Sequence, residues 1–199
     1  MSTPKRPRGS YAGTAEFRQR VLDVALQTLA TRGFDATTLQ LIADEVGRSK
    51  AGLLHHFGSR EELLLAVVRH RDDVNRELFA AGPDGDFSAS VALAAHNATV
   101  PGLVALFAMG AALAGSDTTD TERRRYYTER YSRTRSRYAQ RIARAQQLGV
   151  VRSDIDAESA ATLILATMDG LQTQWLLDPS VDMADHLSTM ISLLHPSCG

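Results

Sequence analysis

The stretch TTLQLIADEVGRSKAGLLHHF, residues 37–57, decides the fold, because it predicts two short helices joined by a tight turn. Thr37 is placed to cap the first helix, and Gln40 three residues later completes a capping box. Gly47 supplies the left-handed residue that ends this helix, and Ser49 caps the next one. Apolar residues between these signals recur at helical spacing and define one buried face: Leu39, Ile42, Ala43 and Val46.

The second of these helices, Lys50–Phe57, has an inner face made by Leu53 and Phe57. Its outer face carries no acidic residue, is small at its start and is polar at its end. The outer residues are Lys50, Ala51, Gly52, His55 and His56. Such a face can approach the major groove of DNA, where the first turn of a recognition helix meets the base edges. The stretch therefore predicts a helix-turn-helix.

The longer segment TTLQLIADEVGRSKAGLLHHFGSREELL resembles the helix-turn-helix of the TetR family of transcriptional regulators, and the resemblance extends over roughly residues 14–74. Two positions depart from the family pattern. The turn commonly reads Gly-Val-Ser, and here Arg48 replaces the apolar middle residue. A tyrosine that often touches a phosphate is common where this chain has Leu54. Arg48 offers a compensating contact to the DNA backbone.

The resemblance implies an all-α protein with an N-terminal three-helix DNA-binding domain and a C-terminal helical domain for ligand binding and dimerisation. It implies a cytoplasmic, sequence-specific transcriptional regulator, a repressor released from a near-palindromic operator by a small hydrophobic ligand. The homodimer is expected to form through the last two long helices. The residues expected to contact DNA are Thr38, Arg48, Ser49, Lys50, Ala51, Gly52, His55, His56 and Arg60.

The charge of the chain is distributed unevenly. The formal net charge is −1, which does not suggest a nucleic-acid binder. Residues 1–60, however, hold nine of the 22 Lys and Arg and five of the 23 Asp and Glu, so they carry +4, and the rest of the chain carries −5. A basic end on an acidic body fits a protein that docks on DNA through one end, although chance fluctuation over 60 residues is the alternative.

Composition shifts predict three segments. Residues 1–13 are rich in Pro, Gly and Ser and are expected to form a disordered basic arm, either along DNA or as a solubilising tail. Residues 14–80 are the DNA-binding domain with its linking helix, whose start is marked by Ser59 and Glu62. Residues 81–199 begin with the breaker AGPDGD and form the effector-binding and dimerisation domain. Outside the helix-turn-helix, helices are expected over 14–32, 59–80, 87–98, 101–114, 119–148, 156–177 and 182–194.

The helices 87–98 and 101–114 are short of charge around nearly their whole circumference, so they are expected to be buried. The helix 119–148 is dense in arginine at all angles, and we interpret it as a solvated helix whose arginines pair with acids elsewhere, rather than as a nucleic-acid patch. Candidate walls of an apolar effector cavity, chosen by residue type and position, are His96, Phe107, Met109, Tyr127, Met168 and Trp175.

Other chemistries find little support. His55 and His56 are adjacent, so on a helix they point about 100° apart and cannot chelate a metal together. No nucleophile elbow, phosphate loop or dinucleotide-binding glycine pattern occurs, and no run of 18 apolar residues predicts a membrane span. We therefore expect no catalytic residue, cofactor or metal. The alternative function is a helical small-molecule-binding protein whose N-terminal part does not read DNA, and glutamate at Lys50, His55 and His56 would separate the two.

Overall fold

The computed structural model describes residues 8–79, 82–117 and 119–196, and for residues 8–12 it describes the backbone alone. This described part of the chain is all-α, as predicted, and holds no strand. Its helices are α1 Arg8–Arg32, α2 Leu39–Glu45, α3 Lys50–Phe57, α4 Arg60–Leu78, α5 Ser88–Asn97, α6 Pro101–Ser116, α7 Thr121–Gln147, α8 Ala157–Leu177 and α9 Met183–Ser192.

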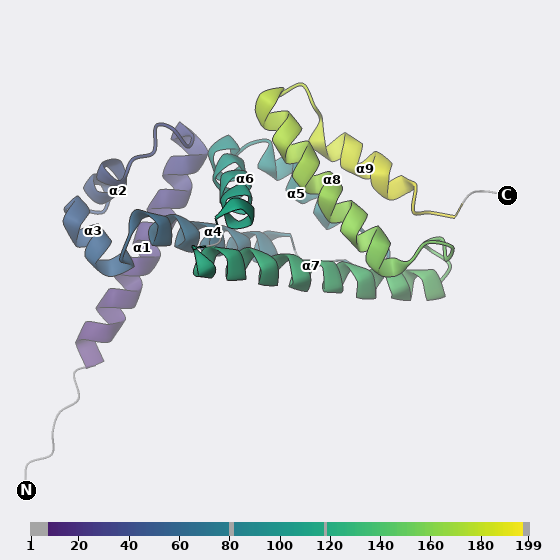
Figure 1. Cartoon of the computed structure of the whole chain (residues 1–199), viewed down its shortest axis with the longest axis horizontal. Coiled ribbons are helices and arrows are strands. Elements are labelled where there is room, and N and C mark those ends of the chain that lie inside the picture. Colours follow the sequence, from purple (N-terminus) through teal and green to yellow (C-terminus); the bar gives the residue numbers. More distant parts are fainter. Residues whose placement is uncertain (1–7, 80–81, 118, 197–199) are drawn as a thin grey trace, which may run out of the picture.

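Figure 1 shows α1, α2 and α3 at one end of the molecule, with the later helices extending away from them. We call α1 to α3 the head and α5 to α9 the body. The chain passes from head to body through α4. The helix α6 joins the two by packing, because it contacts α1 and α4 as well as α7 and α8. The head is therefore attached to the body in two ways, through the chain at α4 and through the packing of α6 against α1 and α4.

The turns of the head follow local sequence signals. Gly47 has a φ of +66° and ends α2. The hydroxyl of Ser49 caps α3 by accepting the N–H of Gly52 at 3.0 Å. Ser59 caps α4 by accepting the N–H of Glu62 at 3.0 Å. These three predictions are confirmed, and together they fix where α3 begins and where it gives way to α4.

The cap of α2 differs from the prediction. Thr38, not Thr37, is the N-cap, and its hydroxyl accepts the N–H of Leu41 at 3.1 Å, so the predicted capping box of Thr37 and Gln40 is wrong. The hydroxyl of Thr37 instead donates to the carbonyl of Gly33 at 2.7 Å. This bond ties Thr37 back to the end of α1, which leaves the next hydroxyl to start α2.

The first helix is longer than expected. We predicted a disordered arm up to residue 13 and a helix from Thr14, but α1 begins at Arg8. Residues 1–7 of the predicted arm lie outside the described residues. The sequence offers a reason for the new start, because Pro7 precedes α1 and proline is tolerated at the beginning of a helix but not in its interior. Gly9 and Gly13 weaken a helix without stopping it.

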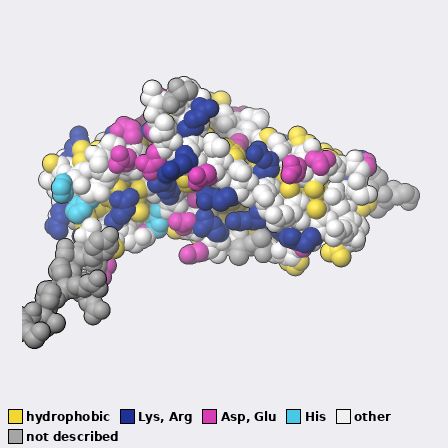
Figure 2. Space-filling view, turned by 60° about the horizontal axis from the view of Figure 1, so that its bottom comes forward, with side chains coloured by type: hydrophobic (Ala, Val, Ile, Leu, Met, Phe, Trp, Pro, Cys, Tyr) yellow, Lys and Arg dark blue, Asp and Glu magenta, His cyan; other side chains and the backbone are white. Residues whose placement is uncertain are grey.

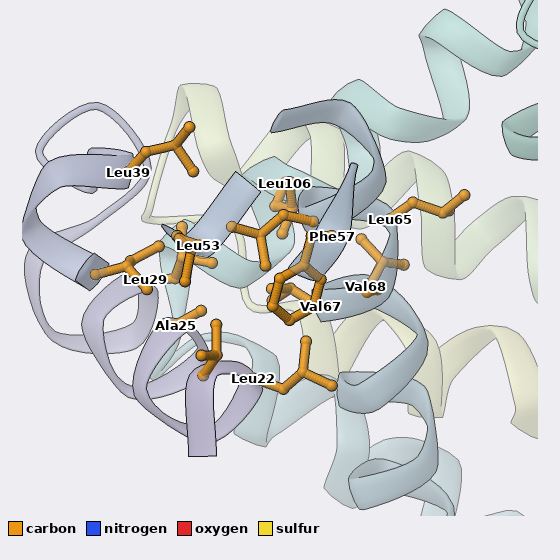
Figure 3. Close-up of a cluster of buried hydrophobic side chains, with 14 of the residues drawn as sticks. Leu22, Ala25, Leu29, Leu39, Leu53, Phe57, Leu65, Val67, Val68 and Leu106 are labelled. Atoms are coloured by element: carbon orange, nitrogen blue, oxygen red, sulfur yellow. The ribbon is translucent and has the colours of Figure 1, made fainter. Parts of the chain in front are cut away.

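One hydrophobic core holds the head together and continues into the body. Figure 3 shows buried side chains from α1, α2, α3, α4 and α6 converging there, with Leu53 and Phe57 supplied by α3. The contributions of α6 and α7 are Leu103, Leu106, Phe107, Ala114, Tyr126 and Tyr127. The predicted domain boundary between residues 80 and 81 lies outside the described residues. Apolar packing nevertheless runs from α4 to α6 and α7, so head and body share a core.

A second core lies within the body and is made by α5 to α9 with their connecting segments. The expectation that the residues of α6 are buried around nearly the whole helix is wrong, because Met109 and Leu113 are 46% and 45% exposed. Only part of α6 packs on its neighbours.

In the part of the chain that the structure describes, no single helix is long and apolar enough to cross a membrane. The helices α5 and α6 meet that test only as a pair, and they are bent by 103° at their break.

Candidate DNA-binding face and effector cavity

The outer face of α3 lies at the end of the molecule that is farthest from α8 and α9 (Figure 1). Lys50, Ala51, His55 and His56 are exposed there, and Gly52 is half-buried. Figure 2 shows histidine side chains at the head end of the surface. The structure thus brings the predicted recognition residues together on one face. This face carries the ammonium group of Lys50, the small residues Ala51 and Gly52, and the imidazoles of His55 and His56.

The other predicted DNA-contact residues all stand at or beside the first turn of a helix. Thr38 and Ser49 are the N-caps of α2 and α3. Arg48 is exposed in the turn before α3, and Arg60 is the first residue of α4 and is exposed. The first N–H groups of a helix have no partner within it and carry partial positive charge, so they favour phosphate groups. The starts of α2, α3 and α4 therefore each offer such donors.

The ring of Phe17 on α1 contacts two of these side chains. The guanidinium carbon of Arg48 lies 5.4 Å from the centre of the Phe17 ring. The imidazole of His56 lies 4.7 Å from the same ring. Arg48 thus occupies the place of the usual apolar turn residue by lying over an aromatic ring, and it keeps its charge.

Sequence reasoning missed two arginines of α1 that contact the helix-turn-helix. Arg18 donates to the carbonyl of His56 at 3.4 Å, and its guanidinium carbon lies 4.4 Å from the Phe57 ring. Arg20 donates to the carbonyl of Val46 at 3.3 Å. Both bond to the last turn of α2 or α3, where cations are favourable. The only signal in the sequence was the positive charge of Arg18 and Arg20 within the helix expected over 14–32.

A cavity of about 930 Å³ lies between α4, α5, α7 and α8. Its lining includes seven arginines: Arg69, Arg71, Arg76, Arg125, Arg130, Arg133 and Arg137. It also includes five carboxylates: Asp72, Asp73, Glu122, Glu129 and Asp169. The lining is therefore mixed and not largely apolar, contrary to expectation. Neither here nor elsewhere in the described residues do three or more His, Cys, Asp or Glu form a group that could hold a metal ion.

Of the six residues predicted to line an effector cavity, only Met168 borders this one. The other five lie elsewhere: Phe107 and Tyr127 in the shared core, Trp175 in the second core, Met109 exposed on α6, and His96 with its ring 5.3 Å from that of Phe79. Those residues were chosen by type, and most apolar side chains of a helical body pack between helices. The charged residues that border the cavity were not predicted as its walls.

Asp72 is the centre of a buried charge cluster at the cavity. It accepts the hydroxyl of Tyr126 at 2.6 Å and the Nε of Arg130 at 2.5 Å, and its other oxygen lies 3.7 Å from Arg71. Arg71 also donates to the side-chain oxygen of Asn97 at 3.1 Å. One carboxylate of α4 thus serves two guanidinium groups, one on α4 and one on α7.

The pKa shifts follow from this crowding. Burial lowers the pKa of Arg71, although the Asp72 carboxylate works against that shift. Burial also opposes the charge of Arg130, but Asp72 outweighs it and holds the pKa of Arg130 above its usual value. Burial raises the pKa of Asp169, which the hydrogen bond from Tyr131 at 2.7 Å offsets only in part. The cluster thus places two guanidinium groups beside Asp72, with the less easily ionised Asp169 in the same lining.

A helix-turn-helix head on a helical body with its own cavity defines a ligand-responsive DNA-binding regulator. Two family models match the chain accordingly. The model of bacterial regulatory proteins of the tetR family matches residues 21–67, and the model of the BetI-type transcriptional repressor C-terminal domain matches residues 105–193. The chain belongs to the TetR family of transcriptional regulators.

Relatives cover most of the chain. The HTH-type transcriptional repressor AcnR of Corynebacterium efficiens is 24% identical over 180 residues, which is 90% of this chain and 91% of that protein. A transcriptional regulator from Saccharomonospora viridis, solved in complex with choline, is 28% identical with a TM-score of 0.67 and covers 89% of this chain and 94% of its own. Thermus thermophilus FadR, solved with lauroyl-CoA, shares the fold at 22% identity, with a TM-score of 0.56 and 89% and 92% coverage.

Proposed function

We propose that the chain acts as a homodimeric repressor that binds a near-palindromic operator through α3 and leaves it when a small molecule fills the body cavity. The outer face of α3 carries this proposal, because it is exposed and free of acids. Lys50 positions α3 in the major groove, and Ala51 and Gly52 permit close approach. The residues that hold phosphates or bases are Thr38, Arg48, Ser49, His55, His56 and Arg60. The protein acts in the cytoplasm, on the chromosome.

A dimer supplies the two recognition helices that a near-palindrome requires, since a two-fold axis places them on one face of the duplex. Support comes from the outer side of α8, where Leu163 and Leu177 are 50% and 83% exposed. Ala166 and Gln174, which are also exposed, lie between them at helical spacing. We assign this side of α8, together with α9, to the dimer interface.

The cavity is placed to influence the head. Its wall includes α4, and α4 contacts α1 through His70, whose Nε2 lies 2.7 Å from the carboxylate of Asp23. A ligand that moves α4 therefore moves α1 and changes the distance between the two copies of α3. A nearly complete switch requires the ligand to favour the released state by about 5.5 kcal/mol. The relatives leave the ligand class open, because choline is a cation and lauroyl-CoA is an anion.

The test is DNase footprinting of the purified full-length protein on the DNA that flanks its own gene, repeated over a range of salt concentrations. We expect protection of a near-palindromic site, with affinity falling steeply as salt rises because phosphate contacts release counterions. Lys50→Glu replaces a contact with repulsion, and we expect it to cost at least about 1–3 kcal/mol of binding free energy.

Arg135→Glu is the matched control, since it makes the same change of charge at an exposed position of α7. It should leave the footprint unchanged. Protection that survives glutamate at Lys50, His55 and His56 together would show that α3 does not read DNA. A folded dimer that protects no site in a genome-wide selection of bound fragments would favour the alternative, a small-molecule-binding protein.

A further inference from the structure

Around the body cavity, all the carboxylates have partners within the protein, whereas some of the arginines have none among the described residues. Every carboxylate that lines it already has a donor or a cation beside it. The pairs are Asp72 with Arg130 and Tyr126, Asp73 with Arg76 at 2.8 Å, Glu122 with Arg69 at 2.9 Å, Glu129 with Arg125 at 3.9 Å, and Asp169 with Tyr131. A cationic ligand would therefore meet acids whose charge is already balanced, at least in part, by the protein.

Two arginines of the same lining are in the opposite situation. Arg133 and Arg137 are both exposed, and neither has a hydrogen bond, ion pair or aromatic contact among the described residues. They are four residues apart on α7, so they project from the same face of the helix. Each guanidinium group presents several N–H donors in a planar arrangement that suits carboxylate and phosphate groups.

Within the part of the chain that the structure describes, the buried side of the cavity holds two unpartnered donors and one unpartnered acceptor. Arg71 and Asn97 are only 4% and 1% exposed and line the cavity, yet the Nε of Arg71 and the Nδ2 of Asn97 have no hydrogen-bond partner. A buried donor without an acceptor is destabilising. The Oε1 of Gln172 is unpartnered too, and its amide can turn over to present its nitrogen. The buried lining thus adds to the excess of donors over acceptors around the cavity.

The aromatic rings of the cavity are already engaged. The guanidinium carbon of Arg69 lies 5.2 Å from the centre of the Tyr126 ring. The ring of Tyr138 is stacked against Phe87 at 6.1 Å, and the Phe79 ring contacts His96. A quaternary ammonium group is bound by free aromatic faces. The cavity therefore lacks the open aromatic cage that such a cation requires.

We propose that the cavity binds an amphipathic organic anion, with its carboxylate or phosphate group between Arg133 and Arg137 and its apolar part toward Leu93, Leu165 and Met168. This proposal rests on the proposed function in one respect, namely that this ligand is the effector that releases the operator. Leu93 of α5 and Leu165 and Met168 of α8 are apolar residues of the same lining.

The test uses isothermal titration calorimetry on the full-length protein with four probes that share an eight-carbon chain: octanoate, octyl phosphate, octyltrimethylammonium and 1-octanol. We expect at least one anion to bind once per subunit and more tightly than the cation and the alcohol. The comparison of octanoate with octyl phosphate tells which anionic group fits better. Replacing both arginines, Arg133→Gln with Arg137→Gln, should weaken the anion at least about tenfold.

The control is the double variant Arg124→Gln with Arg135→Gln, which removes two exposed arginines of α7 that do not line the cavity. It should keep the affinity of the unaltered protein, and melting curves of both double variants verify that they fold. The proposal is overturned if the cation binds as tightly as the anions, if all probes bind equally, if the Arg133/Arg137 variant keeps full affinity, or if neither anion binds at millimolar concentration.

Operator binding without ligand, measured on the same samples, separates this proposal from the proposed function. Full footprints with no anion binding would reject the ligand class alone. Anion binding that depends on Arg133 and Arg137, with no footprint on any DNA, would retain the cavity assignment and reject the regulator. Release of the operator by the anion in the unaltered protein, but not in the Arg133/Arg137 variant, would support both.

Discussion

The carbonyl oxygen of Leu29, near the end of α1, lies directly against the position that a side chain at Gly102 would occupy in the first turn of α6. A β-carbon there would also stand 2.9 Å from the α-carbon of Gly33. Both neighbours are backbone atoms, which cannot turn aside as a flexible side chain can. The head and the body thus meet at a contact that only glycine permits.

Gly102→Ala should therefore destabilise the protein by about 1–3 kcal/mol, as overpacking does in a close-packed interior. The matched control is Gly115→Ala in the same helix, where an added β-carbon meets nothing within 4 Å. Alanine should stabilise that site by up to about 1 kcal/mol, because glycine is the poorer helix former. Urea unfolding measures both, and equal effects of the two substitutions would contradict the close contact at Gly102.

Asp72→Asn should be among the most destabilising single changes in the body. It removes the charge that compensates Arg71, which is buried, and Arg130, which is partly buried with 23% of its side chain exposed. Breaking a fully buried pair costs about 3–5 kcal/mol, so we expect a loss near or somewhat below the lower end of that range. Asp73→Asn is the control, because its ion pair with Arg76 is exposed and such pairs contribute about 0–1 kcal/mol. Chemical denaturation of the two variants should rank them clearly, and a loss below about 1 kcal/mol at Asp72 would refute the shared-carboxylate arrangement.

Asp169 should give stability a measurable pH dependence. Burial raises its pKa above the ordinary value of about 3.9, so the folded protein holds this proton more tightly than the unfolded chain does. Its contribution to the free energy of unfolding is therefore fully present below about pH 3.9 and is lost as pH rises through the folded pKa. Asparagine cannot ionise, so the stability of Asp169→Asn relative to the unaltered protein should rise with pH over that window.

Denaturant titrations of both proteins at several pH values test this difference. Using the difference between the two proteins cancels the contributions of other carboxylates, such as Asp84 and Asp154, whose pKa values are lowered by hydrogen bonds from Arg144 and Arg152. Two stability curves that run parallel from acid to neutral pH would show that Asp169 does not titrate abnormally.

The outer side of α8 should control assembly. Leu163→Glu with Leu177→Glu places charges on the side assigned to the dimer interface, and we expect a shift from dimer to monomer in light scattering, together with loss of operator protection. Leu78→Glu is the control, because Leu78 is also a largely exposed leucine but lies at the end of α4. A double variant that stays dimeric would move the interface elsewhere, and the exposed Met109 and Leu113 of α6 would then be examined.

The head was predictable because its structure is encoded by short-range signals. Gly47, Ser49 and Ser59 each act on residues within a few positions along the chain, and the structure places each of them as expected. The error at Thr37 is equally instructive. Two adjacent threonines offer the same cap, and the choice between them was made by a contact to Gly33 across the preceding turn. That contact is itself local, four residues back along the chain, but two identical side chains do not indicate which of them makes it.

The cavity was not predictable in the same way, because its walls come from helices distant in the chain. Arg130 and Asp72 are 58 residues apart, and nothing in either helix specifies that they meet. The expectation that arginines of the long helix pair with acids elsewhere is confirmed for Arg130 and Arg144. It fails for several others among the described residues, and of these Arg133 and Arg137 border the cavity and mark the candidate ligand site. Which arginines remain unpaired depends on how α4, α5, α7 and α8 cross.

The hydrophobic core that α1 to α4 share with α6 and α7 limits how such regulators can be recombined. A hybrid protein made by joining this DNA-reading end to a foreign sensor in the loop after α4 would keep the chain continuous but would divide that core. Leu103, Leu106 and Phe107 would then have to be matched by residues that evolved against another partner. The crossover is better placed beyond Tyr127, so that α6 and the start of α7 travel with the end that binds DNA.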